Sequence, residues 1–170
     1  MNQSDPQRSD VPQSLAEARD RYWPGIEALI AQIIDRAGDE GSLTAMIWSH
    51  LDTGGKRIRA VLPSLVLSAL GGAGEQALAA GGAVELIHNA TLVHDDLQDG
   101  DTHRRGAPTL WTRFGANAAI NCGDALFFYA GQLLNRLPCS PEKLVRCHQQ
   151  QFVRHGQHNH FVCSVLSQQF

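Results

Sequence analysis

The sequence predicts an all-α fold, a helical bundle. Apolar residues recur at helical spacing along most of the chain, whereas valine-rich alternation and Asn-Gly hairpin signals are absent. Apolar residues make up 43% of the 170 residues, enough to bury one core. We therefore expect a single domain, preceded at residues 1–13 by a polar tail with two prolines that is predicted to be disordered.

Serine caps and glycine turns mark the first two predicted helices. Ser14 suits the N-cap of a helix that runs to about Ala37. Gly38 and Gly41 then frame a turn, and Ser42 opens the second helix.

The third predicted helix lies between two glycine-rich breaks. The Thr-Gly-Gly break at 53–55 ends the second helix, and the third begins near Lys56. Pro63 predicts a kink, and the glycines within 71–74 stop the helix. Its apolar positions follow the i, i+3, i+4, i+7 rule: Ile58, Val61, Leu62, Leu65, Val66 and Ala69.

The longest predicted helix spans about Glu75 to Asp99, and Gly100 is well placed to end it. One narrow stripe of this helix is small and apolar at one end and acidic at the other. The stripe comprises Ala77, Gly81, Val84, His88, Leu92, Asp95 and Asp99. It predicts a pocket lining with a hydrophobic floor and a charged mouth. A loop, a helix from about Gly115 to Leu137, and another helix after Pro141 complete the predicted elements.

Charge and cysteine usage exclude several classes of function. The net charge of −3 gives no electrostatic footprint for nucleic acid, and no apolar run is long enough to cross a bilayer. The N-terminus lacks the apolar core of a signal peptide, and the four cysteines have no CxxC spacing. We expect a cytoplasmic protein with free thiols.

An acidic cluster and two basic segments are the candidate functional residues. Asp95 and Asp99 are four residues apart on one helix face, and carboxylate pairs of this kind bind magnesium together with substrate phosphates. Lys56 and Arg59 lie three apart after two glycines, at a predicted helix N-terminus that favours anions. The guanidinium groups of the Arg-Arg pair at 104–105 suit phosphate oxygens. Together, the acidic pair and the two basic segments predict two phosphorylated ligands, one bound through a metal ion and one bound directly.

A plainer alternative exists for each segment. The acidic cluster is also explained as a solvated helix end or as a partner of nearby arginines. The glycine-lysine segment is also explained as a C-cap followed by a solvated basic turn, and the two arginines as salt-bridge partners of the acids.

Three segments, GGKRIRAVL, ELIHNATLVHDDLQDGDTHRRGAPT and FGANAAINCGDALF, closely resemble the trans-type polyprenyl diphosphate synthases over residues 54–137. The resemblance implies a large isoprenoid-synthase helical bundle, usually homodimeric, that binds Mg2+ and condenses isopentenyl diphosphate with an allylic diphosphate. It implies that Asp95 and Asp99 bind magnesium with Asp96 in support, and that Arg104 contacts the allylic diphosphate. The residues that it implies for isopentenyl diphosphate are Lys56, Arg59, His88 and Arg105.

Product length in this resembled family depends on the bulk just before the first aspartate. Ala90 and Thr91 occupy those positions and are both small. The resemblance therefore favours a product of about twenty carbons or longer, although other helices could close the floor.

The resembled family carries a second aspartate-rich motif that this sequence lacks, and no Asp or Glu follows Glu142. We therefore expect residues 14–157 to be the N-terminal part of a polyprenyl synthase domain, apparently truncated, with a divergent segment at 158–170. The alternative is a non-catalytic helical subunit that associates with a full-length synthase. A class I terpene cyclase is a third possibility, and Lys56, Arg59 and Arg105 argue against it.

Overall fold

The computed structural model describes residue 12 and residues 14–153, so the predicted tail, apart from residue 12, and the predicted segment at 158–170 lie outside the described residues. In this part of the chain the prediction of an all-α fold is confirmed, apart from one short hairpin. The elements are α1 (Leu15–Ile33), α2 (Leu43–Leu51), α3 (Ile58–Ala69), the 3-10 turn η2 (Gly74–Ala77), α4 (Leu78–Asp99), β1 (His103–Arg104), β2 (Ala107–Pro108), α5 (Leu110–Phe114), α6 (Ala116–Leu134) and α7 (Pro141–Val153).

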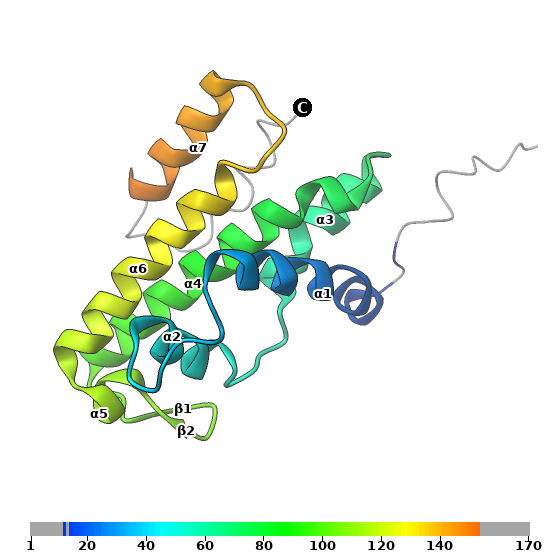
Figure 1. The fold of residues 1–170 in the computed structure, drawn as a ribbon. Coiled ribbons are helices and arrows are strands. Elements are labelled where there is room, and N and C mark those ends of the chain that lie inside the picture. Colours follow the sequence, from blue (N-terminus) through cyan, green and yellow to red (C-terminus); the bar gives the residue numbers. More distant parts are fainter. Residues whose placement is uncertain (1–11, 13, 154–170) are drawn as a thin grey trace, which may run out of the picture.

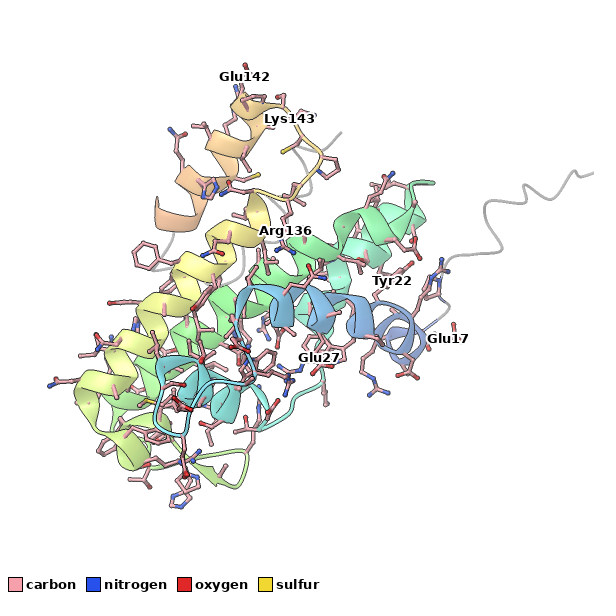
Figure 2. The ribbon with its side chains drawn as sticks, viewed as in Figure 1. Glu17, Tyr22, Glu27, Arg136, Glu142 and Lys143 are labelled. Atoms are coloured by element: carbon pink, nitrogen blue, oxygen red, sulfur yellow. The ribbon has the colours of Figure 1, made fainter. Side chains whose placement is uncertain are left out.

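The long helices α4 and α6 form the centre of the bundle and pack along each other (Figure 1). Helices α1 and α3 pack against α4, and α7 packs on the end of α6. Arg136, which follows α6, reaches across to α1, where its Nη1 donates to Gln32 Oε1 over 2.7 Å (Figure 2). None of the helices in the described residues combines the length and apolar character that crossing a bilayer requires.

Both predicted serine caps are present, but α1 is shorter than expected. Ser14 Oγ accepts from the Glu17 backbone N–H over 3.1 Å, and Ser42 Oγ caps α2 in the same way. The helix ends at Ile33 instead of about Ala37, because Ile34 is extended. The Ile34 carbonyl accepts from the indole N–H of the buried Trp48 over 3.0 Å. A tertiary hydrogen bond thus overrides local helix propensity.

Helix α3 begins two residues later than predicted. Gly55 has φ 141° and Arg57 has φ 54°, so the chain cannot be helical before Ile58. The predicted helical relation between Lys56 and Arg59 is therefore wrong, since Lys56 lies in the preceding loop. Pro63 lies inside α3 and is buried.

The C-terminal end of α4 is as predicted, and its N-terminal end is not. Gly100, with φ 72°, ends the helix after Asp99, whereas the expected first turn at Glu75 belongs to the 3-10 turn. The stripe along α4 changes from buried at Gly81 and Val84 to exposed at Asp99. The stripe therefore runs from the core to the surface, and the predicted pocket along it stays a prediction.

The connection between α4 and α6 is more structured than predicted. Residues 103–104 and 107–108 pair as antiparallel strands, with His103 opposite Pro108. Helix α5 follows, and the predicted helix from Gly115 to Leu137 is α6, which ends at Leu134. The predicted helix after Pro141 is confirmed as α7.

Gly81 sets the separation of α3 and α4. A Cβ at this position would lie 2.1 Å from the Ala60 carbonyl oxygen, a backbone atom that cannot move independently of α3. We expect Gly81→Ala to lower the free energy of unfolding by about 1–3 kcal/mol through overpacking, measured by urea denaturation. Gly131→Ala on α6 is the control, because its Cβ would make only ordinary contact with His148, at 3.4 Å. Equal stability of the two variants would contradict the prediction.

Candidate functional site

The acidic end of α4 presents its carboxylates in two directions. Asp95 is half-buried and Asp99 is exposed, one helical turn apart, whereas Asp96 is 1% exposed. Magnesium is bound through one or two carboxylates and completes its shell with water and substrate phosphates. The described residues contain no group of three or more His, Cys, Asp or Glu that could hold a metal alone. Two carboxylates one helical turn apart are the kind of donor set that magnesium shares with a phosphorylated ligand.

Asp96 belongs to a salt bridge with Arg104 of β1. Arg104 Nη2 and Nε lie 2.6 and 2.7 Å from Asp96 Oδ1. This hydrogen bond is the main cause that raises the pKa of Arg104, and Asp101 and Asp95 add to it against burial. Asp96 Oδ2 is buried and accepts no hydrogen bond from the described residues. The salt-bridge alternative is therefore present for Asp96, and it fixes Arg104 next to the acidic cluster.

Arg59 and His88 meet at the contact between α3 and α4. Arg59 Nη1 lies 3.5 Å from His88 Nε2, on a partly exposed surface. His88 and Asp95 share the stripe of α4, seven residues or about 10 Å apart along the helix axis. The structure thus places two of the residues predicted to bind isopentenyl diphosphate together. They lie two helical turns from Asp95, toward the N-terminus of α4.

Arg105 contacts the glycine loop, residues 54–57, which contains Lys56. Its guanidinium Nη1 donates to the Gly54 carbonyl, and its own φ of 51° turns the chain between β1 and β2. Burial and then the neighbouring Arg57 lower the pKa of Arg105, and Glu85 opposes them. Arg105 and the loop carrying Lys56 therefore lie together, although they are far apart in the sequence.

Sequence reasoning missed a buried polar network behind this loop. Arg57 Nη1 lies 2.6 Å from Glu85 Oε1, with the two side chains 10% and 5% exposed. Asn89 Nδ2 donates to the Glu85 backbone carbonyl over 2.8 Å and to Glu85 Oε1 over 3.2 Å. The spacing of Glu85 and Asn89, four apart, was a usable signal, but the partner Arg57 could not be inferred from spacing alone.

His50 completes the buried region. It is 5% exposed, and its Nε2 has no hydrogen-bond partner among the described residues. Burial, with Arg105, Arg104 and Arg57 adding positive charge, lowers the pKa of His50 to about 4, against the contrary effect of Asn89. His50 is therefore neutral at physiological pH.

The lowered pKa of His50 predicts an acid-sensitive fold. As the pH falls from about 6.5 to about 4, the unfolded chain takes up a proton at His50 and the folded chain does not. The free energy of unfolding of the unaltered chain should therefore fall by up to about 3 kcal/mol over this range, and His50→Gln should abolish this decrease. Urea unfolding at several pH values measures both. His103→Gln, in the exposed hairpin, is the control. A pH dependence that is identical in the His50 variant and the unaltered chain would refute this assignment.

The two positions predicted to set product length differ in burial. Ala90 is 0% exposed and belongs to the core, so its small side chain faces the interior of the bundle. Thr91 is half-buried, and its hydroxyl donates to the His88 carbonyl over 2.8 Å. A larger side chain at Ala90 would have to be accommodated within the packed core.

Comparison with known proteins identifies the family. The polyprenyl synthetase family model matches residues 40–158. A geranylgeranyl pyrophosphate synthase of Geoglobus acetivorans is 44% identical over 97 residues, 57% of this chain and 30% of the relative. A farnesyl diphosphate synthase of Geobacillus stearothermophilus is 38% identical over 114 residues, 66% of this chain and 38% of the relative.

Solved structures agree with the fold. The geranylgeranyl pyrophosphate synthetase of Pyrococcus horikoshii superposes with a TM-score of 0.72 at 34% identity, covering 80% of this chain and 41% of that structure. The chain thus spans less than half the length of these relatives. The matched region contains the glycine loop, the whole of α4 and the hairpin. This chain belongs to the polyprenyl synthetase family.

Proposed function

We propose that this chain provides the diphosphate-binding part of a prenyltransferase that condenses isopentenyl diphosphate with an allylic diphosphate into a longer trans-polyprenyl diphosphate. One observation carries the proposal. His88, whose Nε2 lies 3.5 Å from Nη1 of Arg59 on α3, shares one stripe of α4 with Asp95 and Asp99, so a cationic site lies about 10 Å along the helix axis from an acidic one. Two phosphorylated substrates need this arrangement.

Each site residue then has a role. Lys56, Arg59, His88 and Arg105 bind the diphosphate of isopentenyl diphosphate directly. Asp95 and Asp99 bind the allylic diphosphate through Mg2+, since carboxylates alone repel it. Arg104 contacts the allylic diphosphate from β1, and Asp96 orients its guanidinium through the salt bridge.

The chemistry follows from these positions. A magnesium ion held by Asp95 and Asp99 would supply Lewis-acid stabilisation of the departing diphosphate. The allylic C–O bond breaks, the alkene of isopentenyl diphosphate forms the new C–C bond, and one proton leaves. The side chains of this chain hold the two substrates in reach of each other and shield the reacting carbons from water. The small side chains of Ala90 and Thr91 favour a product of about twenty carbons or longer.

We further propose that the site works within a larger helical assembly, as a homodimer or with a full-length synthase. Along one face of α6, Phe128 is 72% exposed and Ile120 is 43% exposed, eight residues apart. Exposed apolar side chains at this spacing favour association. The same face supports the second candidate function, a non-catalytic subunit that associates with a full-length synthase. Cys122, Cys139 and Cys147 are free, which fits a cytoplasmic location.

The test is a turnover assay with Mg2+, isopentenyl diphosphate and labelled farnesyl diphosphate. The purified chain is measured alone and mixed with a full-length synthase of the family. Prenyl products from the chain alone would support the enzyme. Altered products only in the mixture would favour the subunit, and the absence of both effects and of substrate binding would refute the proposed function.

A further inference from the structure

The ion pair between Arg57 and Glu85 anchors the glycine loop to α4. Arg57 Nη1 is bound to Glu85 of α4, and its Nη2 donates over 2.5 Å to the carbonyl of Leu51, the last residue of α2. The guanidinium carbon also lies 4.5 Å from the centroid of the Trp23 ring on α1. One side chain therefore connects three helices at the point where the loop enters α3.

The backbone at Arg57 is unusual for a residue with a side chain. Its φ of 54° is in the left-handed region, which costs a non-glycine residue free energy and persists only where surrounding contacts enforce it. Here the enforcing contacts are those of the guanidinium. The conformation directs the chain so that Lys56 lies before the turn and Arg59 lies in the first turn of α3.

The pair is poorly suited to bind a diphosphate itself. Both terminal nitrogens of Arg57 are engaged, and the side chain is 10% exposed. Glu85 is negative, 5% exposed, and compensates the charge of Arg57. Two cationic groups that the proposed function uses flank the loop, since Arg59 follows it and Arg105 donates to Gly54 within it. Movement of the loop would displace both groups relative to Lys56.

We propose that Arg57 and Glu85 are positioning residues for the isopentenyl diphosphate site. They fix the loop of residues 54–57 so that Lys56, Arg59 and Arg105 converge on one anion, without contacting it. This inference rests on the proposed function, because it concerns the same site. Asn89 supports the pair by donating to Glu85.

The test measures binding of inorganic pyrophosphate by calorimetry in magnesium-free buffer with chelator, so that the acidic pair does not contribute. The double variant Arg57→Met with Glu85→Met replaces the buried pair by apolar groups, a change that is often neutral for stability. We expect its thermal unfolding to stay near that of the unaltered chain while pyrophosphate binding weakens about tenfold or more. Hydrogen exchange of the amides at 53–57 should become faster.

The matched control is Arg36→Met with Glu27→Met. Arg36 has the same kind of contacts, ion pairs with Glu27 at 2.9 Å and with Asp52 at 3.3 Å and a guanidinium 3.6 Å from the Trp48 ring centroid, but none with residues 54–57. Pyrophosphate binding should be unchanged in this variant. Arg57→Lys keeps the positive charge but loses one of the two hydrogen bonds that the guanidinium donates, to Glu85 and to the Leu51 carbonyl. Its affinity for pyrophosphate should lie between those of the unaltered chain and the Arg57 and Glu85 double variant.

The outcomes separate the inference from the proposed function. Unaltered affinity in the folded Arg57 and Glu85 double variant would overturn the positioning role alone, as would an equal loss in the Arg36 and Glu27 control. Failure of the unaltered chain to bind pyrophosphate would overturn both. If the double variant does not fold, Arg57→Lys decides, and unaltered affinity in that variant refutes the inference.

Discussion

Simultaneous replacement of Asp95 and Asp99 by alanine is expected to weaken magnesium-dependent binding of an allylic diphosphate by about 100-fold or more. Changing one residue that only supports a metal ligand typically costs about 10–100-fold in affinity, so removing both proposed ligands should cost at least the upper value. The remaining acid of the motif, Asp96, is buried against Arg104 and cannot replace them. Binding is measured by calorimetry with farnesyl diphosphate, with and without Mg2+.

Two comparisons make this prediction specific. Isopentenyl diphosphate binding without magnesium should be unchanged in the double variant, since His88, the contact of Arg59, lies two helical turns before Asp95 on α4. Asp20→Ala on α1, where the side chain is 68% exposed, controls for a general change of charge. If the Asp95 and Asp99 variant retains metal-dependent binding, the acidic end of α4 is a solvated helix terminus.

Glu85→Gln is expected to destabilise the fold by about 3–5 kcal/mol, because it leaves the charge of Arg57 buried without its partner. Glutamine keeps the shape of glutamate, so the loss arises from electrostatics and not from a cavity. Asn89, which also donates to the Glu85 carboxylate, loses a charged acceptor at the same time. Urea denaturation gives the change in the free energy of unfolding.

The control for this variant is Glu27→Gln on α1, labelled in Figure 2. Glu27 pairs with Arg36 over 2.9 Å, but both side chains are at least 40% exposed. Solvent screens such a pair, so we expect a loss of about 1 kcal/mol or less. Equal losses in the two variants would show that burial of the Arg57 and Glu85 pair does not determine its energy.

Several features followed from the sequence because local rules decide them. Ser14, Ser42 and Gly100 act as caps through their own side chains or backbone freedom, and they lie where predicted. The stripe on α4 follows from helical periodicity, which needs no knowledge of the partners. The three family motifs likewise carry their order and spacing in the sequence itself.

The misplaced boundaries and the missed residues have a different origin. Helix α1 ends early because the Ile34 carbonyl is the acceptor for Trp48, a residue fourteen positions later. Helix α3 begins late because the guanidinium of Arg57 is anchored to Leu51 and Glu85. No pattern within either segment records these contacts.

The sequence by itself determined the helical class, the caps, the acidic and basic motifs and the family to which they point. Only the tertiary structure decided which charges are paired. Asp96 binds Arg104, Arg57 binds Glu85, and Arg105 contacts the glycine loop, each across at least eight residues of sequence. The physical reason is that helical periodicity is a property of neighbouring residues, whereas the pairing of buried charges depends on how the packed helices bring distant side chains together.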